Sequence, residues 1–149
     1  MSKFNFTELV NSPMADIVSA GLGDGTVAFT SDTDLNKLVK MGASNNFVLT
    51  EDGDEIEGFV FAIEPITVND GVSFGTVQRN KRLQAEVAAG VTTALVPGTD
   101  LVVSAGQAAP GTAGKPQVKK GTPATFKWRV IRIVSGTGVA GDTVLVERI

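Results

Sequence analysis

The chain has 149 residues, of which 42% are hydrophobic and 19% charged, and its net charge at neutral pH is −3. This length and composition are typical of one folded globular domain, and the charge gives no electrostatic reason to bind nucleic acid or an acidic membrane surface. The sequence has no His, no Cys and no Tyr, which excludes a Ser-His-Asp triad, a thiolate nucleophile, disulfides and zinc sites built from His or Cys.

Acid–base chemistry by Asp, Glu or Lys stays open, but we expect no enzyme, no cofactor and no metal site. No apolar run approaches the roughly 20 residues of a membrane helix, and the beginning of the chain, MSKFNFTELVN, lacks the apolar core of a secretory signal. Seventeen Gly and six Pro, together with many Val and Thr, favour an all-β fold.

Residues 1–30 carry apolar side chains at neither a helical nor a strand spacing, and Pro13 and several glycines interrupt them. One interpretation is a loosely held lead-in to the fold. The other is an extended arm that buries Phe4 and Phe6, two residues apart, on a neighbouring subunit, with Leu9 as a further contact.

Residues 32–42 can be read in two ways. Asp32 followed by Leu35, Leu38 and Val39 fits a capped helix of two turns that ends at Gly42. The same letters fit an Asp turn followed by a strand over residues 37–41, and periodicity cannot decide over so short a span.

A strand at residues 47–50 leads into EDGDEIEG, a stretch with five acidic residues among eight. Clustered carboxylates suit Ca²⁺, but Gly53 falls between the acids and the spacing fails the EF-hand pattern, so we interpret the stretch as a solvated turn. Residues 57–63 follow with apolar side chains on both faces, which predicts a strand covered on both sides. Pro65 predicts that this strand ends or lies at an edge there.

Residues 73–87 are predicted to form a hairpin whose turn lies at Arg79-Asn80-Lys81-Arg82. Three basic residues at the tip raise the possibility of a phosphate site, but the patch is short and lacks interleaved aromatics, which favours a solvated turn. Arg79, Lys81 and Arg82 are candidate contacts to acidic groups of a partner.

The region 104–125 is rich in Gly, Ala, Pro and Thr and is predicted to be a loop. It is long for a compact domain, so we expect it to be mobile or held by something outside the domain. FKWRVIRIV, residues 126–134, is the strongest strand, and Trp128 within it is expected to be a core or interface anchor. Gly136, Gly138 and Gly141 match GxGxxG, but the remaining residues form a strand and no helix can follow, so this is a hairpin loop before a last strand at 143–148.

Two stretches resemble capsid decoration (cement) proteins of tailed bacteriophages, especially short-tailed ones: DLNKLVKM…FVLTEDGDEIEGFV…VNDGVSFGTVQRNKR and WRVIRIVSGTGVAGDTVLVERI. The similarity covers residues 32–88 and 126–149, and it leaves out the first 30 residues and the Gly/Pro-rich loop. The family's pattern has an Asp turn before a Lys-Val strand, which favours a strand at residues 37–41. The matching motifs are structural, so no catalytic residue is carried over.

The resemblance implies an all-β protein, an antiparallel sandwich or jelly-roll-like barrel with an extended N-terminal arm and long Gly/Pro loops. We accordingly expect an arm or lead-in at 1–30 and one β domain at 31–149. The implied partner is the major capsid protein, bound on the outer surface of a virion assembled in the host cytoplasm. There a homo-oligomer, a dimer with a trimer as the alternative, would bridge neighbouring subunits and stabilise the shell without touching DNA.

Two other functions compete with this one. The first is a non-catalytic β-sandwich that binds glycans on a fibre or surface protein, although one Trp and no Tyr leave few aromatic platforms for sugars. The second is a trimeric β-rich nucleotide hydrolase similar to dUTPase, whose Gly-Val-Ile-Asp motif and following Tyr this chain lacks.

Overall fold

The computed structural model describes residues 17–25, 28–69, 72–79 and 82–149, and within these ranges it contains ten β-strands and no helix. The expectation of an all-β fold is therefore confirmed. None of the described segments forms a helix long and apolar enough to cross a membrane. The strands are β1 (Ile17–Leu22), β2 (Leu38–Met41), β3 (Phe47–Leu49), β4 (Gly58–Asn69), β5 (Val72–Gln78), β6 (Leu83–Val87), β7 (Leu101–Ser104), β8 (Gln117–Lys120), β9 (Trp128–Ser135) and β10 (Thr143–Arg148).

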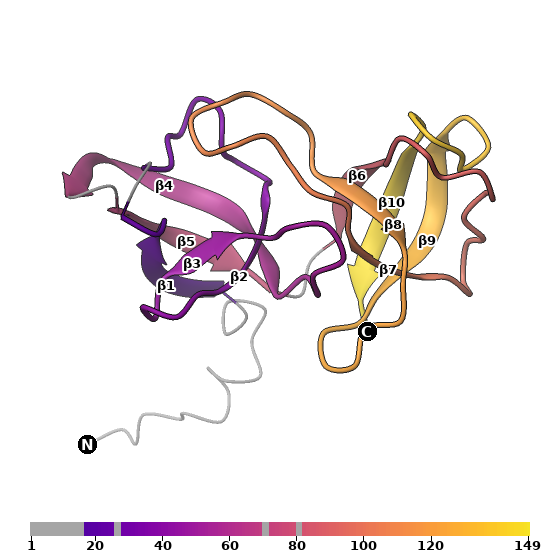
Figure 1. The fold of residues 1–149 in the computed structure, drawn as a ribbon, viewed down its shortest axis with the longest axis horizontal. Helices are drawn as coiled ribbons and strands as arrows, with labels where there is room; N and C mark the ends of the chain where they lie inside the picture. Colours follow the sequence, from indigo (N-terminus) through magenta and orange to yellow (C-terminus); the bar gives the residue numbers. More distant parts are fainter. Residues whose placement is uncertain (1–16, 26–27, 70–71, 80–81) are drawn as a thin grey trace, which may run out of the picture.

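The strands form two closed barrels that follow one another along the chain (Figure 1). The first has the strand order β1-β3-β2-β4-β5 and the second the order β10-β6-β8-β7-β9. We expected one β domain over residues 31–149, an antiparallel sandwich or jelly-roll-like barrel, and the strand order gives two closed barrels. It also takes residues 17–22, which we had assigned to the lead-in, into the first barrel as β1.

The second barrel repeats the topology of the first. In each, the first strand runs parallel to the third, and every other neighbouring pair is antiparallel. The registers match as well: Leu22 faces Phe47 across the parallel pair of the first barrel, and Val87 faces Val118 in the second. A sheet register is specified by which side chains face the core, and buried valines occupy equivalent positions in both barrels, Val39 and Val102 in the second strands and Val60 and Val130 in the fourth.

Two local irregularities are repeated too. In each barrel the fourth strand carries a β-bulge at the residue after a buried valine, Phe61 in β4 and Ile131 in β9. Each second strand also follows a turn closed by an aspartate four residues after its start: the Asp34 carboxylate accepts from Thr30 N at 2.7 Å, and the Asp100 carboxylate accepts from Val96 N at 2.8 Å. Bulges bend and twist strands at fixed places, so the two barrels are copies of one design.

Three predictions about local structure have clear outcomes. Residues 32–36 form turns and β2 follows, so the interpretation of turn and strand is confirmed over the helix. Residues 136–142 form the loop of the β9–β10 hairpin, as predicted for the Gly-rich motif. The predicted hairpin over 73–87 is wrong, because β5 pairs with β1 and β4 while β6 pairs with β8 and β10, and residues 79–82 join the two barrels.

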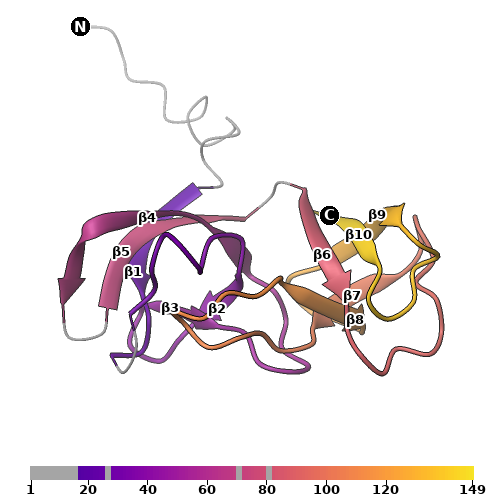
Figure 2. The same ribbon diagram turned by 90° about the horizontal axis from the view of Figure 1, so that it is seen from above.

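The strand expected to end at Pro65 continues to Asn69. The alternative, an edge position, agrees with the pairing: β2 meets β4 only at Gly58 and Phe59 among the described residues, and the ladder to β5 is interrupted between Ile63 and Val68. A proline is tolerated where its missing N–H leaves no ladder hydrogen bond unmade. The far end of the β4–β5 hairpin consequently projects from the first barrel on the side away from the second (Figures 1 and 2).

Candidate functional site

The two barrels share an apolar junction. Leu38, Ile56 and Phe59 of the first barrel belong to the same buried cluster as the core of the second. Trp128 lies in this cluster with no exposed surface, and its indole N–H donates to Ile56 O at 2.9 Å, while its ring meets Phe59 edge-on with centroids 6.3 Å apart. Trp128 is thus an interface anchor between the two halves of one chain, which confirms its expected burial.

The acidic stretch 51–58 begins with the predicted exposed turn, closed by Asp54 N donating to Glu51 O at 3.1 Å, and it also contacts the second barrel. Gly53 N donates to Ser104 O and Ser104 N donates to Asp54 O, both at 2.9 Å, which adds a short antiparallel contact beside β7. The Glu55 carboxylate accepts hydrogen bonds from three successive backbone N–H groups, those of residues 124–126. Asp52 pairs with Lys119 at 2.7 Å. Two of the acids that resembled a Ca²⁺ loop, Asp52 and Glu55, are therefore side-chain contacts across the junction.

The segment 105–116, which we call the strap, leaves the second barrel between β7 and β8 and crosses to the first barrel (Figure 1). Gln107 at its base acts as a substitute for a strand partner: its side-chain oxygen accepts from Leu38 N at 2.6 Å and its nitrogen donates to Leu38 O at 2.8 Å. Thr50 adds a hydrogen bond to Ser104 at 2.8 Å. The prediction of a loop over 104–125 is wrong for β8 (Gln117–Lys120). The part before β8 is held by Leu38, which lies inside the domain expected at 31–149, so these contacts do not come from outside that domain.

A buried ion pair fastens the tip of the strap. Lys37 has no exposed surface, and its ammonium donates to Asp34 at 2.7 Å and to three strap carbonyls, those of Ala108, Ala109 and Thr112, at 2.6–3.1 Å. The Asp34 carboxylate in turn accepts from Gly111 N. A charge can be buried when its partner and its hydrogen bonds replace the lost water, and here the strap supplies those groups.

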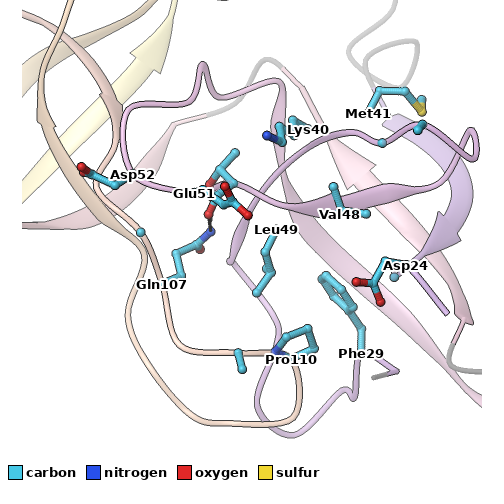
Figure 3. A pocket seen from close by; sticks show the side chains of 16 residues that line it. Asp24, Phe29, Lys40, Met41, Val48, Leu49, Glu51, Asp52, Gln107 and Pro110 are labelled. Carbon is cyan, nitrogen blue, oxygen red and sulfur yellow. Dashed lines mark hydrogen bonds between the residues drawn. The ribbon is translucent and has the colours of Figure 1, made fainter. Parts of the chain in front are cut away.

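Between the strap and the β2–β3 hairpin lies a groove of about 850 Å³ (Figure 3). Phe29, Leu49 and Pro110 gather at one end of it, and Lys40 and Glu51 lie at the other. The volume falls within the range of small-molecule pockets. The lining offers apolar contact and hydrogen bonds, but two of its charged side chains, Lys40 and Asp52, are already paired with Asp54 and Lys119.

Four carboxylates at the junction and in the second barrel have lowered pKa values. Backbone N–H groups of residues 126 and 124 lower the pKa of Glu55, and Lys120 together with Val96 N lowers that of Asp100. Burial raises the pKa of Asp54, but the Lys40 ammonium and the Glu51 N–H outweigh it and the pKa is lowered. Thr137 N and two neighbouring N–H groups lower the pKa of Asp142. All four are stabilised as anions, which makes them structural acceptors rather than proton donors near neutral pH.

Of the residues predicted to contact a partner, Arg79 and Arg82 are described by the structure. Arg79 lies 3.6 Å from Glu57 and Arg82 lies 3.5 Å from Glu147, so both face acids of their own chain. Arg148 also donates to Arg79 O at 3.2 Å, which ties the linker to the last strand. Phe4, Phe6, Leu9 and Lys81 lie outside the described residues.

Sequence reasoning missed three residues that hold the strap, Lys37, Asp34 and Gln107. A lysine within an apolar run, LNKLVK, was the one available signal, because a side chain at an inward position must be paired when it is charged. In the described part of the chain no three acidic side chains are grouped in a way that could hold a metal ion. Comparison with protein-family models, with curated proteins and with solved structures found no match.

Proposed function

We propose that this protein is a structural component of a phage virion that binds the outer surface of the capsid and bridges neighbouring major capsid subunits. The proposal starts from the sequence resemblance to decoration proteins. The observation that carries it further is the junction: Trp128, the strap and the acidic stretch join two similar barrels through apolar packing and hydrogen bonds. A bridge opposes the separation of two subunits only when its own halves do not separate first.

The charged groups of the junction favour a binding role over catalysis. Lys37 and Asp34 are buried and saturated by the strap, and Asp54, Glu55 and Asp142 hold backbone N–H groups or a lysine as anions. A general acid or base needs a pKa near the working pH and room for a substrate proton. Groups engaged in this way serve the fold instead.

Bridging also benefits from repetition. When one barrel has bound a subunit, the second binds its neighbour as an intramolecular step, so modest contacts combine into high avidity. The two barrels share their topology and register, which suits a shell whose neighbouring subunits are copies of one another.

The test is sedimentation of the purified protein with empty, expanded heads of the phage that encodes it, followed by heating of the shells with and without it. We expect cosedimentation and a higher temperature of shell disruption. A Trp128→Ala variant that remains folded should bind with lower shell protection, because its halves are less firmly joined. Absence of binding to heads of any maturation state would contradict the proposal.

A second candidate is a glycan-binding module, and the groove beside the strap is the observation that favours it. Gln107, Glu51 and backbone groups could hydrogen-bond sugar hydroxyls over the apolar end at Leu49 and Pro110. Trp128, the one Trp in the sequence, is fully buried at the junction and offers no stacking platform. A glycan array followed by calorimetry separates the two functions, and we expect no glycan above background.

A further inference from the structure

Two exposed phenylalanines mark the outer face of the first barrel. Phe61 on β4 is 50% exposed and Phe74 on β5 is 57% exposed. The ladder between β4 and β5 pairs Ala62 with Thr76. Phe61 is next to Ala62 on β4, and Phe74 is two residues from Thr76 on β5, so both phenylalanines lie near this pair. Because residues two apart on a strand point to the same face, Phe74 and Thr76 share the outer face, which is opposite to that of the buried Val77.

The second barrel has no such face. The register places Ile131 where the first barrel has Phe61, and Thr143 where it has Phe74, and both are half-buried. The difference lies in the side chains, because strand order and bulge are the same in the two barrels. Exposed aromatic side chains on a sheet face are unfavourable in water and mark contact surfaces when they occur together.

The face is also accessible from both sides. Among the described residues, no strand pairs with β4 beyond Phe59 on the edge away from β5, and β1 meets β3 only at Leu22. The β4–β5 hairpin points away from the second barrel (Figures 1 and 2), so the second barrel leaves this end of the molecule open. A free edge beside an apolar face is the arrangement that accepts an added strand.

The chain itself contains a segment of suitable chemistry. Residues 1–16 precede β1, and within them Phe4 and Phe6 are spaced for one face of a strand, with Lys3 beside them. Glu64 on β4 is exposed and has the opposite charge. Sixteen extended residues reach about 50 Å, which is ample to cross to another molecule.

The register of β1 favours a second molecule over the same one. Ile17 pairs with Gln78, whereas Gly21 pairs with Phe74. The segment preceding Ile17 therefore enters at the opposite end of β5 from Phe74, and it would have to reverse direction to cover that ring in its own chain. A second copy can present the same segment in either direction, because β1 of the first chain does not fix where it starts.

We propose that residues 3–10 of a second copy of this chain lie across the outer face of β4 and β5, with Phe4 and Phe6 packed against Phe61 and Phe74. The exchange of arms is mutual in a two-fold dimer, so each copy fills the face of the other. This self-association requires no capsid and stands or falls separately from the function proposed above.

The first test is sedimentation velocity of the full chain over a range of concentrations. We expect the wild-type protein to form dimers, and each of two variants, Phe61→Ser with Phe74→Ser and a deletion of residues 1–14, to weaken dimerisation by at least about tenfold. The matched control is Val96→Ser with Val134→Ser, two exposed apolar residues of the second barrel, which should dimerise as the wild type does. Unchanged circular dichroism shows that each variant is folded.

The second test distinguishes exchange from packing within one chain. The double phenylalanine variant keeps its arm but lacks the face, and the deletion variant keeps the face but lacks the arm. Mixing the two should form a one-to-one heterodimer, which only an arm of one chain on the face of another can give. A monomeric wild-type protein, variants that dimerise as well as the wild type, or a mixture without heterodimer would each overturn the proposal.

Discussion

The two barrels have the same topology but differ in one connecting loop, which in the second barrel joins it to the first. Their strands, registers and bulges correspond, and both close the turn before the second strand with an aspartate. They differ in the connection between the second and third strands, which is five residues long in the first barrel (42–46) and twelve in the second (105–116). A long insertion in a surface loop costs little closure entropy, so the longer loop was free to become the strap that joins the barrels.

The two aspartates that close these turns differ in their surroundings, although they are not equivalent in register: Lys37 O accepts from Val60 N and Asp100 O accepts from Val130 N, so Lys37 is the residue that matches Asp100. In the second barrel Asp100 pairs with Lys120, whose side chain is 65% exposed. In the first barrel Asp34 pairs with Lys37, which is fully buried because the strap covers it. One turn is therefore closed by a buried aspartate whose lysine partner is exposed, and the other by a buried aspartate whose lysine partner is buried as well, and the cost of losing the lysine depends on that burial.

A second contrast concerns the start of the fourth strand. Gly58 faces Val39 in the first barrel, and Trp128 faces Val102 at the same place in the second. A Cβ on Gly58 would lie 2.6 Å from Gln78 O and 2.7 Å from Val77 Cγ1. One copy of the position thus holds the largest side chain of the junction and the other has no room for a methyl group.

The largest expected effect is that of Trp128→Ala, which removes the anchor from the second barrel's copy of this position. We expect a loss of about 5 kcal/mol in the free energy of unfolding, because a large cavity forms and Ile56 O is left without its donor. Urea unfolding followed by circular dichroism measures it. Leu145→Ala, at a half-buried position of β10, is a control of smaller cost. A loss below about 1 kcal/mol would mean that the junction does not depend on the indole.

The ion pairs give the next largest effect and the sharpest test of the difference between barrels. Lys37→Met leaves Asp34 buried without its cation and strips three carbonyls of their donor, and should cost about 3–4 kcal/mol. Lys120→Met should cost less, about 1–2 kcal/mol, because Lys120 is 65% exposed and the buried Asp100 keeps the Val96 N–H as a donor. Adding Asp34→Asn to Lys37→Met should recover part of the loss. Urea unfolding measures both variants. An equal loss in the free energy of unfolding for the two would show that the two ion pairs do not differ in their contribution to stability.

Gly58→Ala tests the empty copy of the position that Trp128 fills. The added methyl group must displace Gln78 O, which belongs to the backbone of β5, so we expect a destabilisation of about 1–3 kcal/mol. Gly53→Ala is a useful comparison, because a Cβ there meets nothing within 4 Å and only the positive φ of +88° opposes the change. Thermal unfolding of both variants separates crowding from backbone strain. A neutral Gly58→Ala would show that β5 can shift.

The smallest expected effect is on pH dependence. The pKa of Glu55 is lowered in the folded protein, so its contribution to stability is complete above its usual pKa of 4.5 and is lost as the pH falls through the range below it. Melting temperatures at pH 7, 5 and 3 should fall at the acid end. Glu55→Gln should flatten this fall by about 2–4 °C, a modest amount because the group is exposed and screened. If the melting temperature of Glu55→Gln fell with pH as steeply as that of the wild type, Glu55 would not contribute to the stability of the junction.

The sequence predicted the strands better than their partners. Alternation and turn residues located most strands, including β9 and β10 with their Gly-rich loop, because these signals are local. They could not tell that residues 79–82 leave one barrel and enter another, because a linker between two strands and a hairpin turn share the same letters. The repeat could not be recognised from the sequence, because equivalent positions hold unlike side chains. Gly58 corresponds to Trp128 and Phe74 to Thr143, and only the register of these positions is the same.

The site was less predictable still. Nothing near Lys37 in the sequence announces that its partners lie at residues 108–112, because a buried pair is defined by elements that meet only in the folded chain. The acidic stretch 51–58 was recognised as structural, but its contacts with residues 104 and 124–126 depend on how the barrels meet.

The strap sets the order in which contacts can form while the chain is being synthesised. Lys37 meets carbonyls that lie 71–75 residues further along the chain, and Asp34 meets an amide 77 residues away. At about 5–20 residues per second, a ribosome needs roughly 4–15 s to synthesise that stretch. During this interval the Lys37 ammonium lacks the strap carbonyls and stays hydrated. The first barrel can make these contacts only after the strap of the second barrel has been synthesised.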